Sequence, residues 1–542
     1  MQKSKKSTTQ NGQSDKKQPI GTPRAVQYLD HQTLGPRLQL FKTTEYSPGS
    51  PFFLPKGTAI INKLIDFLRA QYIHYGYEEV ITPLLYKKSL WEKSGHWAQY
   101  KDDMFTLSCQ HHSSSSSSSS APSSSSSPDD TFGLKPMNCP GHCLIYALNP
   151  RSYKDLPLRL ADFSSLHRNE PSGSLSGLTR VRRFHQDDAH IFCRPDQIGS
   201  EVLTTLEFVL GTYKTFHLPA PQLVLSTRPE TGFIGTLEEW DSAEEALRRV
   251  LTEAVGEGGW ALNEGDGAFY GPKIDIRMPD RAGKQFQIGT VQLDLQLPQR
   301  FDLQYVPHTA DIVTTATTPI LDPDAGTDAD SGAQDSSPAI HRPVMIHRAA
   351  FGSLERFLAL LIEHYQTRWP LWLSPNPVIV LPVHSKTPQL LAYAEHVRAV
   401  LQTGLLNRTG SEHDGGTKAG AGGAEARLRA MRTRRVPLVR VDLDAGLGSL
   451  AAKVARAAAA EYNLKVLVGD KEMETQTVML DFTCQLRGLD GMEEPRVKDQ
   501  VDEAGGTWRD AERTVTKDGR RQMRLPLAQL QGLVMELLHE KL

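Results

Sequence analysis

Residues 167–190, HRNEPSGSLSGLTRVRRFHQDDAH, contain four arginines, three acidic residues and three histidines. Mixed charges of this kind are the ordinary covering of a protein surface, so composition alone does not make the segment a site. The residue types nevertheless suit nucleotide binding, because arginine forks match phosphate oxygens, an aromatic ring stacks on a base and a carboxylate accepts from an amine. A nucleotide site and a solvated loop are therefore the two alternatives.

The flanking residues predict that this segment is the turn of a β-hairpin. Residues 156–164 and 183–192 have strand character on either side of a polar, glycine-containing loop. Four side chains would then face one pocket: Arg168, Glu170, Arg180 and Phe184. The chain has no G-x-x-x-x-G-K-[ST] sequence, so a nucleotide would be held without a P-loop.

Two domains are predicted around and after this hairpin. Over residues 30–374 helices such as 59–76 alternate irregularly with strands, which predicts an α+β domain with an antiparallel sheet and flanking helices. Over residues 376–542 strands and helices alternate regularly, which predicts a smaller α/β domain with a mostly parallel sheet. The second domain contains no catalytic cluster and is typical of a binding module.

Length and composition agree with two folded domains. The chain has 542 residues, of which 39% are hydrophobic, and a net charge of -2 restricts any nucleic-acid surface to a local patch. Five irregularly spaced cysteines favour reduced thiols over a disulfide framework. No apolar run reaches the length of a membrane span, so we expect a soluble intracellular protein without membrane partners.

Four segments are expected to lie outside both cores. Residues 1–29 are basic and poor in apolar side chains, which predicts either a disordered tail or an organelle transit peptide. Three biased segments are predicted to be insertions: a Ser-rich one at about 110–130, an Asp-rich one at about 308–340 and a Gly-rich one at about 405–430.

Several motifs resemble those of class II aminoacyl-tRNA synthetases. Residues 163–184 are similar to motif 2, and FGSLERF at 351–357 is similar to motif 3. Further ordered matches resemble the threonyl-tRNA synthetases in particular: MNCPGH, QDDAHIF, GAFYGPKIDI, QIGTVQLD, PVMIHRA and, in the second domain, VLVGDKE. The resemblance implies ATP-dependent activation of threonine to threonyl-adenylate and its transfer to tRNA(Thr), with ATP used together with Mg²⁺.

The resemblance implies roles for six ATP-binding residues. Arg168 matches the arginine that holds the α-phosphate and the amino-acid carboxylate, Glu170 matches the acid that reads adenine, and Phe184 matches the ring beneath it. The remaining matches, at the γ-phosphate end and along the site, are Arg180, Arg356 and Gln287. Arg168 and Arg356 are the implied catalytic residues, acting by electrostatic stabilisation. Without motif 2, Arg356 would be interpreted as a solvated arginine on an apolar helix.

The resemblance also implies a zinc site. The family's zinc ligands are matched by Cys139, His190 and His347. Spacing alone would instead suggest a local cluster of Cys139 with His142 and Cys143. The alternative for His142 and Cys143 is that they are packing residues. Three such ligands leave an open position that the amine and hydroxyl of threonine can fill, and valine lacks the hydroxyl. The implied threonine contacts are Asp188, Tyr270 and Gln292. For Asp188 an orienting role beside His190 is the alternative.

The second domain corresponds to an anticodon-binding domain, with an uneven match. Asp481 stands where family members commonly have arginine. Phosphate contact and a solvated basic face are both open for Arg432, Arg434, Arg435 and Lys453. Residues 56–85, which include Pro83, resemble motif 1 and imply a homodimer by analogy.

The resemblance begins near residue 30, so we expect the chain to lack the family's amino-terminal editing domain. We therefore expect weaker discrimination against serine. The short form resembles mitochondrial, notably fungal, members, which implies the mitochondrial matrix rather than the cytoplasm. The alternative function is a catalytically inactive, dimeric RNA-binding accessory protein; retention of the whole catalytic set disfavours it, and the zinc ligands disfavour a serine- or proline-activating relative.

Overall fold

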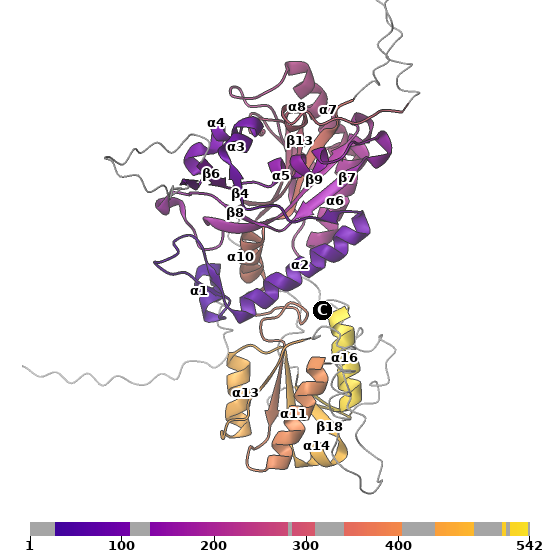
Figure 1. Cartoon of the computed structure of the whole chain (residues 1–542). Helices are drawn as coiled ribbons and strands as arrows, with labels where there is room; N and C mark the ends of the chain where they lie inside the picture. The colour runs from indigo at the N-terminus through magenta and orange to yellow at the C-terminus, as the bar shows by residue number, and fades with distance from the viewer. Residues whose placement is uncertain are drawn as a thin grey trace, which may run out of the picture.

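A computed structural model describes residues 28–108, 131–279, 285–308, 341–403, 439–481, 512–515 and 521–539. These residues form two bodies, the larger from the first part of the chain and the smaller from the last (Figure 1). The predicted tail and the three predicted insertions lie almost wholly outside the described residues. Among the described residues, none of the helices combines the length and apolarity needed to cross a bilayer.

The larger body is built on a nine-stranded sheet in the order β11-β10-β12-β13-β14-β9-β7-β3, with β8 pairing with β9. The strands are β3 (Glu78–Glu79), β7 (Leu158–Asp162), β8 (Ser165–His167), β9 (Arg183–Cys193), β10 (Gln222–Ser226), β11 (Trp260–Asn263), β12 (Lys273–Pro279), β13 (Gln285–Asp294) and β14 (Val344–Ser353). Pairing is antiparallel throughout the centre and parallel only between β10 and β11 and between β3 and β7. The predicted antiparallel sheet is confirmed.

Helices flank this sheet. The principal ones are α1 (His31–Arg37), α2 (Pro55–Tyr75), α5 (Cys139–Ala147), α6 (Ile198–Thr215), α7 (Leu237–Val255) and α10 (Leu354–Tyr365). Shorter elements complete the body: α3 (Lys88–Ser94), α4 (His96–Tyr100), α8 (Gln296–Arg300), the pair β1 (Phe41–Lys42) and β2 (Phe52–Phe53), and the small sheet of β4 (Leu85–Lys87), β5 (Thr106–Ser108) and β6 (Thr131–Leu134).

Helix α2 shows how sequence sets an element's ends. It begins with proline in its first turn, where no amide donor is needed, and ends before Gly76, whose φ of 69° suits glycine. Its buried residues Ile60, Leu64 and Leu68 repeat every four positions and join the main core. The helix predicted over this segment is therefore confirmed.

The smaller body contains a six-stranded sheet in the order β16-β15-β17-β18-β20-β19. Its elements are β15 (Val378–Pro382), α11 (Pro388–Thr403), β16 (Val441–Leu443), α13 (Leu450–Ala459), β17 (Leu464–Val468), α14 (Asp470–Thr475), β18 (Thr477–Asp481), β19 (Glu512–Val515), β20 (Arg521–Pro526) and α16 (Leu527–His539). Among the described strands of this sheet, only β16, β15 and β17 run parallel to one another. The expectation of a mostly parallel sheet is wrong, because α14 is too short for a crossover and β18 returns antiparallel.

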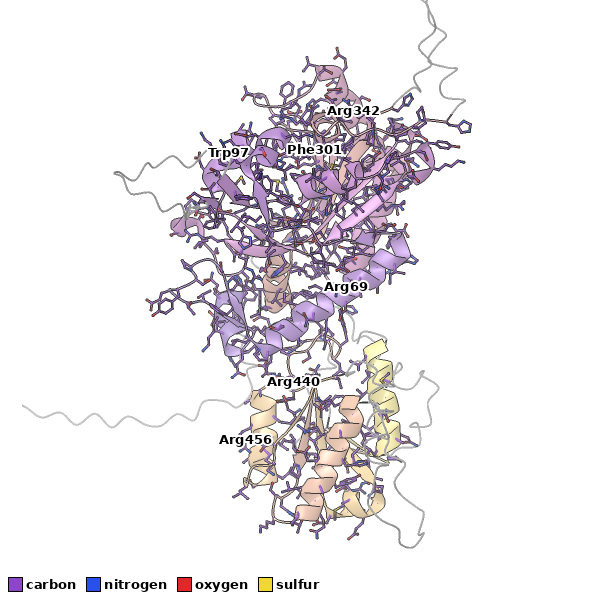
Figure 2. The ribbon with its side chains drawn as sticks, in the orientation of Figure 1. Arg69, Trp97, Phe301, Arg342, Arg440 and Arg456 are labelled. Atoms are coloured by element: carbon purple, nitrogen blue, oxygen red, sulfur yellow. The ribbon has the colours of Figure 1, made fainter. Side chains whose placement is uncertain are left out.

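The two bodies meet between α2 and the near end of the smaller sheet. Figure 2 labels Arg69 on α2 and Arg440 at this junction. The side-chain amide of Asn463 donates to the Trp369 carbonyl at 2.7 Å, which ties the start of β17 to the linker after α10. The division predicted near residue 375 falls in this linker, between α10 and β15.

Candidate active site

Strands β8 and β9 form the predicted hairpin around the motif 2 segment. Their register pairs Ser165 with His185 and His167 with Arg183, and the Arg168 amide donates to the Arg182 carbonyl at 2.8 Å. The more distal half of β9 pairs with β7. The first arm of the hairpin is therefore two short strands in succession rather than one.

One pocket is lined by all six residues for which the resemblance implies ATP binding. They are Arg168, Glu170, Arg180, Phe184, Gln287 and Arg356. Four come from the hairpin, Gln287 comes from β13, and Arg356 comes from the first turn of α10. The fold therefore brings together side chains that the sequence separates widely.

Two contacts within the hairpin shape the pocket. Arg180 pairs with Glu170, with 2.7 Å between Nη2 and Oε2. The guanidinium carbon of Arg168 lies 5.0 Å from the centre of the Phe184 ring, a cation–π distance. The Nε and Nη2 atoms of Arg168 donate to the Pro136 carbonyl at a long 3.4 Å. A charged oxygen of a ligand can replace that weak contact.

Arg356 fixes the far side of the pocket. Its guanidinium donates to the Thr179 carbonyl at 3.2 Å and to the Gln287 carbonyl at 3.3 Å, so it is not the solvated arginine that its helix alone suggests. Burial, together with the nearby charges of Arg168 and Arg180, lowers the pKa of Arg356. Three guanidinium groups facing one carboxylate make this a site for an anion.

Cys139, His190 and His347 converge in a second cluster. One ligand atom from each lies within 4.8 Å of the others, and all three residues are buried. The register of β14 and β9 pairs His347 with His190, whereas Cys139 begins α5. One thiol and two imidazoles are a donor set that suits Zn²⁺, so these residues fit the ion that the resemblance implies.

Two further buried groups support the histidines of this trio. His347 Nε2 lies 2.8 Å from Asp294 Oδ2, which leaves Nδ1 facing His190 Nε2 at 3.0 Å. The other nitrogen of His190, Nδ1, lies 2.7 Å from His142 Nδ1. The assignment of His142 to packing alone is thus incomplete. Asp294 was missed, although its place two residues after Gln292 on a strand puts it on the same face.

His96 is another buried residue that sequence reasoning missed. Its Nε2 lies 3.6 Å from Cys139 Sγ, and its Nδ1 lies 2.8 Å from Ser94 Oγ. Burial lowers the pKa of His96 to about 4. No spacing rule could connect it with Cys139, because α4 and α5 meet only in the folded chain. Cys143, by contrast, packs against Met345 as expected.

Tyr270 and Gln292 lie beside the trio, as the resemblance implies. Gln292 is the register partner of His347 across β13 and β14. The Tyr270 ring stacks on the His347 ring with 5.0 Å between centres, and its hydroxyl donates to Gln292 Oε1. These two polar groups therefore border the cluster on one side.

Asp188 borders the cluster on another side. Its Oδ1 lies 3.8 Å from His190 Nε2, which is too long for a hydrogen bond. Burial raises the pKa of Asp188 to about 6, against the opposing influence of His347. His142 contacts the other nitrogen of the His190 ring, Nδ1.

The smaller body corrects one expectation about basic residues. Lys453 is fully buried, and its ammonium donates to the Pro382 carbonyl at 3.0 Å and to Ser385 Oγ at 2.9 Å. Neither phosphate contact nor a solvated face fits this lysine, since phosphate cannot approach a buried group. Asp481 is also buried. The other candidates, Arg432, Arg434 and Arg435, lie outside the described residues.

Comparisons with known proteins agree with this geometry. The family model for the tRNA synthetase class II core domain (G, H, P, S and T) matches residues 123–318, and the one for the anticodon binding domain matches residues 377–498. A probable mitochondrial threonine–tRNA ligase of Schizosaccharomyces pombe is 44% identical, covering 82% of this chain and 83% of that protein. The mitochondrial threonine–tRNA ligase of Saccharomyces cerevisiae is 41% identical, covering 81% and 83%.

Other relatives are longer. The human mitochondrial threonine–tRNA ligase is 43% identical over 83% of this chain, which spans 53% of its length. A crystal structure of the RNA binding domain of threonyl-tRNA synthetase from Cryptosporidium parvum Iowa II matches with a TM-score of 0.65 and 38% identity, covering 83% of this chain and 92% of that one.

The antiparallel sheet, the motif 2 hairpin and the arginine of α10 together define a class II aminoacyl-tRNA synthetase with an appended anticodon-binding domain. Within this class, the two yeast threonine–tRNA ligases are more than 40% identical to this chain over most of both sequences. The chain belongs to the threonine–tRNA ligase family. The names of these relatives also support the predicted mitochondrial location.

Proposed function

We propose that this enzyme activates threonine with ATP and transfers it to tRNA(Thr). The observation that carries the proposal is that the pocket and the trio share one sheet face. Thr290 and Ala349 line the pocket, and Gln292 and His347 lie two residues along the same strands. Residues i and i+2 of a strand share a face about 7 Å apart, so an amino acid at the trio reaches a nucleotide in the pocket.

In the first step a carboxylate oxygen of threonine attacks the α-phosphorus of ATP, bound with Mg²⁺, and pyrophosphate leaves. Arg168 neutralises the charge that develops on the α-phosphate, while Arg180 and Arg356 hold the departing phosphates. Glu170 and Phe184 position adenine. The protein supplies placement and electrostatic stabilisation, and none of its groups forms a covalent intermediate.

Cys139, His190 and His347 would hold Zn²⁺, which supplies a Lewis acid for the amine and hydroxyl of threonine. Asp188 accepts from the amine, and the polar groups of Tyr270 and Gln292 border the side chain. Valine has nearly the same shape but lacks the hydroxyl, so it leaves polar groups unsatisfied. The chain's own residues thereby select threonine over valine.

In the second step the terminal ribose hydroxyl of tRNA attacks the adenylate carbonyl, and AMP leaves. The smaller body binds the anticodon end of the same tRNA. An inactive accessory role is not favoured, because every residue of the implied catalytic set is present and the described geometry brings the set together.

A homodimer is the assembly that we propose. The motif 1 segment carries two strongly exposed apolar side chains, Ile73 on α2 and Ile81 after β3, at 84% and 89% exposure. Exposed isoleucines on a segment that pairs subunits in this class favour burial by a second copy.

Aminoacylation tests the function directly. Purified protein should attach radiolabelled threonine to tRNA(Thr) in the presence of ATP, and should attach neither proline nor valine. Absence of threonyl-tRNA with protein that binds ATP would refute the proposed activity and return the accessory role to consideration.

A further inference from the structure

His31, the first residue of α1, lies outside motif 2 and yet contacts its loop. Its Nε2 accepts from the Leu178 amide at 3.1 Å, and its Nδ1 lies 2.7 Å from Glu363 Oε1 on α10. The His31 side chain is 6% exposed. Because an amide can only donate, Nε2 is the acceptor and the ring proton sits on Nδ1, directed at Glu363.

Helix α1 is anchored on α10 through several contacts besides this one, and Figure 1 shows the two helices in the same part of the larger body. Just before α1 and just after α10, Leu29 and Gln366 exchange two hydrogen bonds, at 3.1 and 2.9 Å. Burial raises the pKa of Glu363, but hydrogen bonds from His31 and Tyr28 outweigh it and hold the pKa below its ordinary value. The carboxylate thus stays ionised and fixes the imidazole tautomer.

The apex of the motif 2 loop fits closely against this histidine. Leu178 is fully buried in the same cluster as Leu34 of α1. Gly177 has a φ of 49°, and a Cβ added there would fall 2.2 Å from His31 Nε2. Only glycine allows the loop to approach the imidazole this closely.

The next residue of the loop closes a ring of contacts. The Thr179 carbonyl accepts from Arg356, which belongs to the same helix as Glu363. The loop apex is therefore held from both ends of α10: directly by Arg356, and through His31 by Glu363. Arg180, which follows Thr179, takes its position in the pocket from this double attachment.

We propose that His31 is a positioning residue for ATP binding, holding the motif 2 loop where Arg180 and Arg356 face the same phosphates. The inference rests on the proposed ATP site. We expect His31 to touch neither ATP nor threonine. It therefore acts through the motif 2 loop alone and leaves threonine binding unchanged.

Two substitutions separate the contacts of the ring. His31→Gln places an acceptor where Nε2 stands and keeps the Leu178 contact, whereas His31→Asn places its amide where Nδ1 stands and keeps only the Glu363 contact. Calorimetric titration with ATP should give a Kd about tenfold higher for His31→Asn and within about twofold of wild type for His31→Gln. The KM for threonine should stay within about twofold in both variants.

Asp30→Ala is the matched control, because it removes the Asp30–Thr33 cap of α1 without touching the loop. It should leave the ATP Kd unchanged. An unchanged Kd in His31→Asn, equal losses in the Asn and Gln variants, or a parallel rise in the KM for threonine would each overturn the inference.

Gly177→Ala displaces the loop from its other side and serves if His31→Asn does not fold. It should weaken ATP binding by about tenfold, and unchanged binding would contradict the inference. Threonine-dependent pyrophosphate exchange by the wild type is scored separately. ATP binding with the predicted His31 pattern but no exchange would refute the proposed function while supporting the role of His31.

Discussion

His347 on β14 and His190 on β9 are register partners, and their facing nitrogens lie 3.0 Å apart. The backbone ladder therefore sets how the two histidines of the cluster face each other. A slip of one residue would turn His347 away and bring Arg348 to this face. Arg348 instead lies on the opposite face, buried, with its guanidinium 3.2 Å from Asp187. The two histidines therefore lie on one face of these strands and the Arg348–Asp187 ion pair on the other.

Asp294→Asn should weaken zinc binding by about 10- to 100-fold, because it removes the carboxylate that orients His347. Competition with a chromogenic chelator measures the affinity. Asp302→Asn, at a carboxylate that is 69% exposed, is the control and should bind zinc like wild type. A change below about twofold in Asp294→Asn would show that His347 is oriented without it.

Arg356→Gln should lower kcat/KM for ATP by at least about 100-fold, because it removes the charge that we propose stabilises the departing phosphates. Threonine-dependent ATP–pyrophosphate exchange gives this ratio. The control is Arg398→Gln on α11 of the smaller body, at an arginine side chain that is 41% exposed. This variant should leave exchange unchanged. Equal activity of the two variants would remove Arg356 from the mechanism.

Glu461→Gln should stabilise the protein in a pH-dependent way. Burial raises the pKa of Glu461 to about 7, against the attraction of Arg37. Because the folded pKa lies above the unfolded one, ionisation costs stability, fully above pH 7 and not at all below about pH 4.5. The variant should gain on the order of 1 kcal/mol near pH 8 and nothing near pH 4.

Thermal unfolding at both pH values measures this difference. Glu395→Gln, at an exposed glutamate on α11, is the matched control and should show no pH-dependent gain. A gain for Glu461→Gln that is the same at both pH values would point to packing rather than ionisation.

Ile81→Asp should convert the proposed dimer to monomer, because a charge cannot be buried unpaired in a subunit interface. Light scattering during size-exclusion chromatography gives the mass. Leu447→Asp, at an apolar residue of the smaller body that is 90% exposed, should remain dimeric. A dimer that survives Ile81→Asp would place the interface elsewhere.

Local sequence patterns predicted much of this fold. The hairpin was accessible because both arms lie within 40 residues of each other, and α2 was accessible because its apolar periodicity and Gly76 mark its face and end. The direction of β18 was not accessible from strand alternation, since it depends on the short length of α14.

The residues of the candidate site likewise fall into those that local sequence patterns predict and those that they do not. Residues of the hairpin could be assigned to one pocket from strand geometry, but Gln287 and Arg356 joined them only through the family resemblance. His190 and His347 meet because of sheet register, and Cys139 joins them from helix α5, which no spacing rule encodes. His31 and His96 were missed because each contacts a residue far away in sequence, whereas Asp294 could have been found from its place two residues after Gln292 on the same strand.

The most direct test of the central claim is ATP–pyrophosphate exchange with zinc-loaded and chelator-stripped enzyme, using threonine and valine in parallel. If Zn²⁺ held by Cys139, His190 and His347 selects threonine, exchange with threonine collapses on stripping, returns when Zn²⁺ is restored, and is absent with valine. Threonine exchange that persists in zinc-free protein, or valine exchange equal to that with threonine, would contradict this claim.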